Sequence, residues 1–277
     1  MERLINVLGG SGFVGSRYRE LTDNVVINAK YDYEVKDNSE VVYFISTVDN
    51  YNVHINPYLD IETNLTTLVH TLESCKDKNV TFNFISSWFV YGDVQLPAKE
   101  ESYCNPRGFY SITKRTAEQL LISYCETFNI KYRILRLANV LGKSDGKVSK
   151  KKNALQYMIN QVVNNEDIDL YEGGIFYRDY IHVDDVAQAI NLVIEKGNMN
   201  EIYNIGNGEM VFIKQALDYV KTKVNSTSNF GTMEIPQFHK TVQTKNMVLD
   251  ISKIKELGYT PKYDLYQTLD TLINPTI

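Results

Sequence analysis

The chain has 277 residues, of which 43% are hydrophobic and 23% are charged, and its formal net charge at pH 7 is −5. This length can bury a large core, either as one domain of unusual size or as two closely joined domains. The negative balance excludes a global basic field that would recruit nucleic acid or an anionic membrane, so any phosphate ligand must be held by local donors.

The chain begins with an apolar run at residues 4–8, which predicts a short buried strand. A glycine-rich turn, Gly-Gly-Ser-Gly-Phe-Val-Gly, follows at residues 9–15 and leads into a short polar helix that ends near residue 22. A strand before such glycines and a helix after them is the context that indicates a dinucleotide-binding fingerprint.

Each glycine of this turn has its own expected role. Gly9 permits the tight turn, Gly12 lets the backbone approach a pyrophosphate, and Gly15 allows the helix to pack closely on the sheet. The free N–H groups that open the helix, at Phe13 and Val14, attract the phosphates. These five residues are therefore predicted to bind a dinucleotide cofactor.

The end of the second predicted strand, at residues 25–27, bears on which cofactor binds. Dinucleotide-binding proteins normally carry an acidic side chain there, which holds the adenosine ribose hydroxyls. Here that place falls on Asn28, followed by Ala29 and Lys30. An amide removes the repulsion that would exclude a 2′-phosphate, and Lys30 can attract one, although it can equally be an ordinary exposed lysine. The cofactor is NAD or NADP, and these residues favour NADP.

Strands and helices then alternate. Apolar runs predict strands at residues 41–45, 80–85 and 132–138, and helical periodicity covers residues 64–75 and 110–128. Strands that are nearly uniformly apolar and alternate with helices predict a parallel sheet covered on both faces. The expected fold is α/β, a Rossmann-type doubly wound parallel sheet with a smaller, interleaved C-terminal substrate lobe.

The alternation of apolar strands and helices becomes less regular after Gly142. Residues 143–153 are polar and lysine-rich, which predicts a solvated surface loop, and further elements are predicted at residues 155–163, 183–194, 203–205, 213–224 and 265–273. We expect residues 1–142 to form an NAD(P)-binding Rossmann domain on which parts of 178–197 and 240–255 pack. Residues 143–277 mainly form the substrate-binding lobe.

Tyr110 and Lys114 lie four residues apart at the start of a predicted helix, which places a phenol and an ammonium on one helix face. A nearby cation lowers the pKa of a phenol from its ordinary value near 10. A tyrosine so placed can exchange protons with a sugar or alcohol hydroxyl near neutral pH. The pair alone is a weak signal, because any amphipathic helix can carry Tyr-x-x-x-Lys.

Five motifs together are more specific. They are the glycine turn, Ser-Ser-x-x-Val-Tyr-Gly, Tyr-x-x-x-Lys, Leu-Arg-x-x-Asn and Arg-Asp-Tyr-Ile-His-Val-Asp-Asp, in this order and at suitable distances. The set resembles the extended short-chain dehydrogenase/reductases that modify nucleotide-diphosphate sugars, the NAD-dependent epimerase/dehydratase family. The resemblance covers nearly the whole chain, through Leu-Gly-Tyr-Thr-Pro near its end.

The resemblance implies a role for each matching residue. Ser87 would donate a hydrogen bond to the substrate oxygen that is oxidised or reduced, and Tyr110 would carry the proton. Lys114 would bind the nicotinamide ribose and keep the tyrosine acidic. Asn139 and Arg178 would hold the diphosphate of the sugar nucleotide. It also implies a homodimer built by the helices at about 61–75 and 110–128.

Other polar residues have simpler interpretations. Arg136, inside a strand, is expected to be a structural ion-pair partner, and His182 is expected to satisfy a buried backbone group. Asp184 and Asp185 begin a helix, where carboxylates commonly act as caps.

The cysteines and the N-terminal sequence predict a cytoplasmic location. The three cysteines lack Cys-x-x-Cys spacing, which predicts reduced thiols and no metal. With no signal-peptide pattern and no apolar stretch near ~18 residues, we expect a cytoplasmic protein without a membrane span.

The positions after Ser87 narrow the reaction. Related dehydratases have Asp-Glu there, and related 3,5-epimerising reductases have a cysteine in the second position, whereas this chain has Trp88 and Phe89. Neither side chain can transfer a proton, which favours plain hydride exchange at one carbinol, C4. C4 epimerisation and NADPH-dependent reduction of a 4-keto-6-deoxy nucleotide sugar both remain. A 4,6-dehydratase and a non-catalytic NAD(P)-binding regulator are further alternatives.

Two features bear on that choice. The set of site residues is most like that of 4-epimerases, but the short passage from residue 27 to residue 41 indicates that one strand–helix unit is missing, which would weaken cofactor retention. No arginine follows Arg178, so Lys240 or Lys245 would have to contact the nucleotide phosphates. The identity of the nucleotide base of the substrate is left undetermined.

Overall fold

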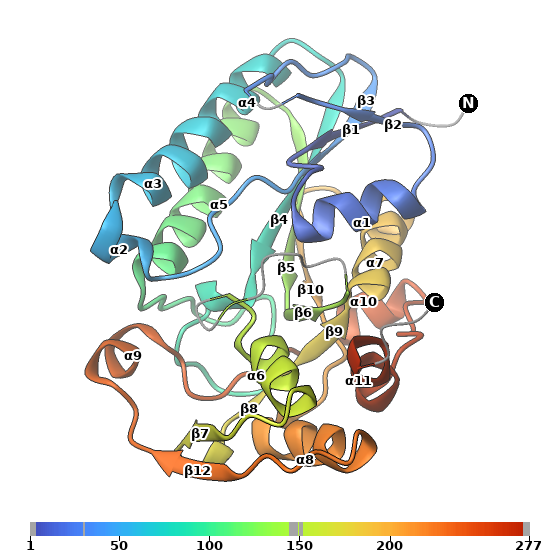
Figure 1. Ribbon diagram of the computed structural model, residues 1–277. Coiled ribbons are helices and arrows are strands. Elements are labelled where there is room, and N and C mark those ends of the chain that lie inside the picture. Colours follow the sequence, from blue (N-terminus) through green and yellow to red (C-terminus); the bar gives the residue numbers. More distant parts are fainter. Residues whose placement is uncertain (1–3, 30, 144–148, 150–151, 274–277) are drawn as a thin grey trace.

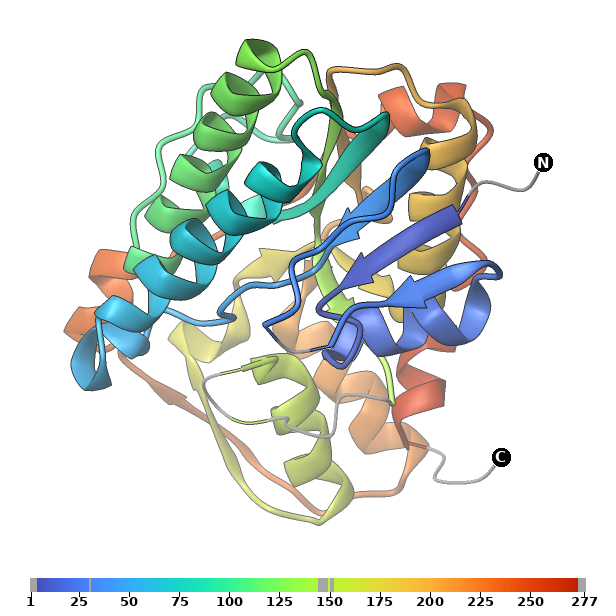
Figure 2. The same ribbon diagram turned by 90° about the horizontal axis from the view of Figure 1, so that it is seen from above.

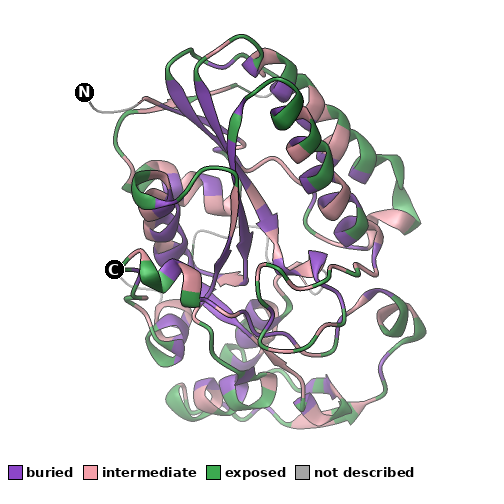
Figure 3. Ribbon diagram, turned by 180° about the vertical axis from the view of Figure 1, so that it is seen from behind, coloured by how far each residue is buried: buried purple, intermediate pink, exposed green. Residues whose placement is uncertain are grey.

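A six-stranded parallel sheet forms the centre of the protein. The computed structural model describes residues 4–29, 31–143, 149 and 152–273. The sheet has the strand order β10-β5-β4-β3-β1-β2. Its strands are β1 (Leu4–Leu8), β2 (Val25–Ile27), β3 (Ser39–Tyr43), β4 (Val80–Ser87), β5 (Lys131–Leu137) and β10 (Glu201–Ile205). Apart from the edge strand β2, these strands are buried along most of their length (Figure 3), which is why their sequences are largely apolar.

Helices cover both faces of this sheet (Figure 2). On one face, α1 (Phe13–Leu21), α7 (Val183–Lys196) and the short α10 (Ser252–Glu256) share one apolar core with the strands. On the other face, α4 (Thr67–Cys75) and α5 (Phe109–Thr127) share a second core. The doubly wound Rossmann-type fold expected from the sequence is confirmed.

The second lobe lies below the sheet in Figure 1 and has its own apolar core. Helices and short paired strands build this lobe. The elements are α6 (Ala154–Val163), β7 (Ile168–Tyr171) paired with β12 (Phe230–Met233), β8 (Tyr177–Arg178) paired with β11 (Val211–Phe212), β6 (Asn139–Leu141) paired with β9 (Tyr180–His182), α8 (Ile213–Lys223), α9 (Gln237–Val242) and α11 (Leu265–Ile273).

Two details of the connections matter for the site. Between β2 and β3 the described residues contain no helix, so the missing unit inferred from the sequence is confirmed. After β3 the chain forms a loop at residues 44–51, the short helices α2 (Asn52–Ile55) and α3 (Tyr58–Ile61), and a π-helical turn at Glu62–Thr66 that leads directly into α4.

Several buried polar groups have the structural partners that their positions suggested. The guanidinium of Arg136 donates from Nε and Nη2 to the two carboxylate oxygens of Glu118, at 3.0 and 2.8 Å, which confirms the expected ion pair. The His182 ring accepts a hydrogen bond from the backbone N–H of Asp184 at 3.2 Å, also as expected.

Asp184 and Asp185 lie in the first turn of α7, as expected, but the side chain that caps this helix is that of His182. Asp184 pairs with Arg17 on α1, with Nε to Oδ1 at 2.6 Å. Asp185 accepts from the backbone N–H groups of Lys262 and Tyr263 at 2.9 and 3.0 Å. The two carboxylates therefore bind α1 and the segment at residues 262–263 to α7. In the part of the chain that is described, no helix is long and apolar enough to cross a membrane.

Candidate active site

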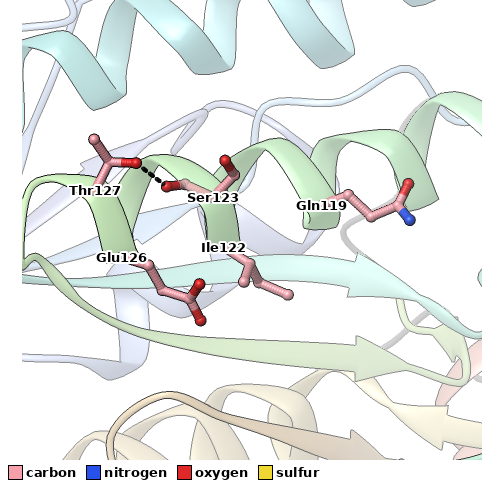
Figure 4. Close-up of a pocket in the computed structure, with 5 residues that line it drawn as sticks. All are labelled: Gln119, Ile122, Ser123, Glu126 and Thr127. Carbon is pink, nitrogen blue, oxygen red and sulfur yellow. Dashed lines mark hydrogen bonds between the residues drawn. The ribbon is translucent and has the colours of Figure 1, made fainter.

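A cleft of about 1040 Å³ lies between the carboxyl ends of the central strands and the second lobe. In open α/β sheets this edge is where ligands bind. The cleft brings together nearly all of the predicted site residues: Gly9, Gly12, Phe13, Val14, Gly15, Ser87, Tyr110, Lys114, Asn139 and Arg178. A second, shallow hollow lies on the outer side of α5 (Figure 4) and contains none of them.

The glycine turn has the geometry that a pyrophosphate needs. Gly9 has a φ of +80°, and a Cβ at Gly15 would lie 2.5 Å from the carbonyl oxygen of Gly9. A Cβ at Gly12 would meet only that oxygen, at 3.4 Å, so the space in front of Gly12 is open. No side chain of the described residues caps the N-terminus of α1, which leaves the first N–H groups directed at the cleft. These residues fit a dinucleotide cofactor.

Asn28 does not line this cleft. Asn28 follows β2 directly, and its Nδ2 donates to the carbonyl oxygen of Glu34 at 2.6 Å. Lys30 lies outside the described residues.

Tyr110 and Lys114 are both buried on the face of α5 that meets the end of β4. Lys114 Nζ donates to the carbonyl oxygen of Ile85 at 2.8 Å and lies 4.2 Å from the centre of the Phe84 ring. The backbone N–H of Tyr110 donates to Oδ1 of Asn50 at 3.1 Å, so the loop after β3 fixes the start of the helix. Helical spacing thus presents both side chains to one wall of the cleft.

The expected lowering of the Tyr110 pKa by Lys114 is not found. Burial raises the pKa of Tyr110 to about 12, and the neighbouring hydroxyl groups of Ser87 and Ser46 lower it only in part. Burial also lowers the pKa of Lys114 to about 7, partly opposed by the charge of Glu118. The reason is desolvation, which disfavours the charged form of each group and is the largest cause of both shifts. At neutral pH Tyr110 is therefore a phenol, which can donate a proton.

Ser87 ends β4 and caps a 3₁₀ turn at Trp88–Val90, with its Oγ accepting from the N–H of Phe89 at 3.4 Å. The Trp88 ring stacks on Phe89 at 3.9 Å, and Phe89 meets the Tyr110 ring edge-on at 5.8 Å. The wall beside Ser87 is therefore aromatic and has no acid or base at these two positions.

Asn139 and Arg178 line the cleft from β6 and β8. Asn139 Nδ2 donates to the carbonyl oxygen of Asp179 at 3.1 Å. Arg178 donates to the carbonyl oxygens of Thr244 and Lys245, and its guanidinium lies 5.3 Å from the centre of the Trp88 ring. No carboxylate among the described residues pairs with Arg178. Burial lowers its pKa to about 10, so it remains a cation at neutral pH and can bind an anion.

Sequence reasoning missed the loop at residues 44–51, which lines the cleft. Asn64, in the π-helical turn, holds this loop by accepting from the backbone N–H of Thr47 at 2.9 Å and donating to Thr113 of α5 at 2.9 Å. Its position in the sequence could have indicated this role, because the loop directly follows the carboxyl end of β3, where ligands of such sheets bind. Lys240, Lys245 and His239 also line the cleft.

Known proteins resemble the chain over most of its length. A family model described as "NAD dependent epimerase/dehydratase family" matches residues 34–206. A putative UDP-glucose 4-epimerase of Methanocaldococcus jannaschii is 26% identical, over 98% of this chain and 97% of that protein. A dTDP-4-dehydro-6-deoxyglucose reductase of Escherichia coli is 28% identical, over 66% of this chain and 57% of that protein.

Solved structures show the same architecture. The crystal structure of a UDP-glucose 4-epimerase with UDP-glucose from Thermotoga maritima matches with a TM-score of 0.85, covering 97% of both chains at 24% identity. At this identity the match bears on the fold alone.

Proposed function

The chain belongs to the NAD-dependent epimerase/dehydratase family, and from this premise we propose that it modifies a nucleotide-diphosphate sugar by hydride transfer at a sugar carbinol, with epimerisation at C4 as the reaction. The observation that carries the proposal is the meeting of Ser87, Tyr110 and Lys114 with the glycine turn in one cleft. Trp88 and Phe89 support it, because they leave no proton-transferring group for elimination or enolisation beside Ser87.

A bound nicotinamide supplies the hydride chemistry. The residues of the chain control the substrate oxygen. Tyr110 must be a phenolate to take the hydroxyl proton as the carbon is oxidised, and the positive charge of an oxidised nicotinamide would favour that phenolate. The phenol so formed returns the proton on reduction. Because burial raises its pKa to about 12, the phenol keeps the proton between these two steps. Ser87 donates a hydrogen bond to the same oxygen, and Lys114 binds the nicotinamide ribose.

Across the cleft, Arg178 and Asn139 would hold the substrate diphosphate. A guanidinium without a carboxylate partner in the described part of the chain is suited to phosphate oxygens, which it binds through a fork of donors. Lys240 and Lys245 line the same side and would add positive charge. The glycine turn and the first turn of α1 would hold the dinucleotide, NAD or NADP, and Asn28 in place of an acid favours NADP.

Reduction of a 4-keto-6-deoxy nucleotide sugar by NADPH is the second candidate. The specific observation in its favour is that the described residues between β2 and β3 contain no helix, because the missing unit would otherwise help to retain the cofactor. An epimerase needs its cofactor to stay bound through the reaction, whereas a reductase must exchange it.

The test begins with identification of the nicotinamide form held by the purified protein, followed by assays with UDP-, dTDP-, CDP- and GDP-sugars. Retained cofactor and a C4-inverted product without net redox change indicate the epimerase. Oxidation of added NADPH in equal amount to a 4-keto sugar indicates the reductase. No turnover with any sugar of either oxidation level would refute both.

Replacement of Tyr110 by phenylalanine tests the proton transfer. Tyr110→Phe should keep dinucleotide binding and lose turnover by about 10²–10⁴-fold. Tyr103→Phe is the matched control, because Tyr103 is exposed and lies outside the cleft. A Tyr110→Phe variant with a near-native rate would show that the assignment is wrong.

We also propose a homodimer in which α4 and α5, with the residues from Ile61, pack against their counterparts. Apolar side chains are exposed on these helices at Ile61, Ile112, Leu120 and Phe128. The hollow drawn in Figure 4 lies on the same helix α5. Sedimentation should give a dimer that Leu120→Glu converts to a monomer, because it would bury a charge in the interface. A wild-type monomer at all concentrations would contradict this assembly.

A further inference from the structure

The loop that joins β3 to α2 (Figure 1) carries a serine to which the proposed reaction assigns no role. Ser46 lines the cleft together with Ser87 and Tyr110. The hydroxyl groups of Ser87 and Ser46 are the side-chain neighbours that oppose the effect of burial on the Tyr110 phenol. Because each hydroxyl group has a single hydrogen to donate, the direction of that hydrogen distinguishes the two serines.

The hydrogen of Ser46 is directed at Asn64. Ser46 Oγ donates to Oδ1 of Asn64 at 3.0 Å. That atom is the amide oxygen, because it also accepts from the backbone N–H of Thr47 at 2.9 Å, and a backbone N–H can only donate. Ser46 is therefore the donor to Asn64, and its oxygen can accept a hydrogen bond from the Tyr110 phenol.

The other contacts of Asn64 allow this hydrogen to turn away. Asn64 is 2% exposed, and its Nδ2 donates to Oγ1 of Thr47 at 2.8 Å and to Oγ1 of Thr113 at 2.9 Å. Thr47 in turn donates to the carboxylate of Asp60. If the hydroxyl of Ser46 rotates, Oδ1 of Asn64 keeps the hydrogen bond from the backbone of Thr47. No buried group of this network is then left without a partner, so the rotation costs little.

The hydrogen of Ser87 has another use. Ser87 Oγ accepts from the backbone N–H of Phe89 at 3.4 Å, and in the proposed reaction its hydrogen is donated to the substrate oxygen. A hydroxyl group that donates to the substrate has no second hydrogen for Tyr110. During the reaction, Ser46 is therefore the serine that can donate to a Tyr110 phenolate.

The charged groups around Tyr110 increase the need for such a donor. The negative charges of Asp60 and Asp49 add to the effect of burial and raise the pKa of Tyr110 further. One turn later on α5, burial lowers the pKa of Lys114 to about 7, so part of its positive charge is lost at neutral pH. Two arginines line the cleft and donate to backbone carbonyl groups of residues 240–245, namely Arg107 and Arg178.

We propose that Ser46 is a further catalytic residue, whose hydroxyl turns from Asn64 to Tyr110 when Tyr110 is a phenolate and stabilises that phenolate. When Tyr110 is a phenol, Ser46 accepts from it and donates to Asn64. No O–H bond of Ser46 breaks, so the proton exchanged between Tyr110 and the substrate is not altered. The inference rests on the proposed function for the role of Tyr110, and it applies to epimerisation and to reduction alike.

A titration of the phenol tests this contact without cofactor or sugar. The full chain is made with 3-fluorotyrosine in place of Tyr110 alone, because the fluorine lowers the phenol pKa and provides a single ¹⁹F signal. Ser46→Ala should lower the ionisation constant of this phenol about tenfold, as expected for a lost hydrogen bond to a charged group. Ser46→Thr keeps a hydroxyl group and should restore the wild-type titration.

Ser123→Ala is the matched control, because Ser123 is exposed on the outer side of the same helix α5. It should titrate as the wild type does. An ionisation constant that is unchanged in Ser46→Ala would overturn the inference, and so would an equal fall in Ser123→Ala.

Turnover provides a second measurement. With a sugar that the wild type converts, kcat of Ser46→Ala at pH 7 should fall about tenfold while KM changes by less than about twofold, because the phenolate and not substrate binding is affected. An absence of turnover with every sugar would refute the proposed function whatever the titration gives. An unchanged titration in a chain that converts a sugar would overturn this inference alone.

Discussion

Replacing Lys114 by methionine removes a cation from a buried position, and the structure defines the pH range in which the loss is measurable. Burial lowers the pKa of Lys114 from 10.5 to about 7. Between these values the unfolded chain binds a proton that the native chain does not. The contribution of Lys114 to the free energy of unfolding must therefore rise with pH over this range. Below the range, the buried lysine destabilises the native chain.

The magnitude follows from the linkage relation. One pKa unit corresponds to about 1.4 kcal/mol, and titration of the native group near pH 7 reduces the slope at the lower end. Lys114 should therefore add about 2 kcal/mol to the free energy of unfolding between pH 7 and pH 9. Lys114→Met should lack this rise, so the wild-type chain gains about 2 kcal/mol on the variant over the same interval.

Urea unfolding at pH 7, 8 and 9 and constant ionic strength measures this difference. Trp88 is the single tryptophan and is 2% exposed, so its fluorescence reports the transition. Lys131→Met, at an exposed position on β5, is the control and should follow the wild type. Parallel behaviour of the wild type and Lys114→Met would refute the claim that desolvation controls Lys114, and the explanation of the Tyr110 pKa with it.

Three further outcomes follow from the packing. Arg136→Met should cost about 3–5 kcal/mol in urea unfolding, because it removes the main partner of the buried Glu118 carboxylate; a cost below about 1 kcal/mol would contradict this. Gly15→Ala should lower stability by about 1–3 kcal/mol, because its Cβ would meet the carbonyl oxygen of Gly9 at 2.5 Å. Gly12→Ala should keep stability and lose dinucleotide affinity; equal melting temperatures for the two alanine variants would count against these separate roles.

Long, regular patterns made most of the fold predictable. The apolar run before Gly9 and the helical periodicity after Tyr110 correspond to β1 and α5 because burial on a sheet and on a helix face each impose a period on the sequence. The paired strands of the second lobe were not predicted, since β8 and β11 contain only two residues each and show no period. The place of β10 beside β5 depends on a distant return of the chain, which no local pattern contains.

The residues that meet in the cleft were largely predictable from the sequence, and their electrostatics were not. Spacing correctly placed Tyr110 and Lys114 on one face of α5, but it could not indicate that both are buried deeply enough for desolvation to be the largest cause of both pKa shifts.

The position of β10 constrains how the protein can be divided. The chain leaves the sheet at β5, builds part of the second lobe, and returns as the neighbouring strand, with Glu201 opposite Arg133. A fragment ending at residue 142 would leave β5 as an open edge and would lose the hydrogen bond from Tyr91 to Asn204. The chain therefore passes from the sheet to the second lobe and back again. No single break in the chain can separate the two lobes.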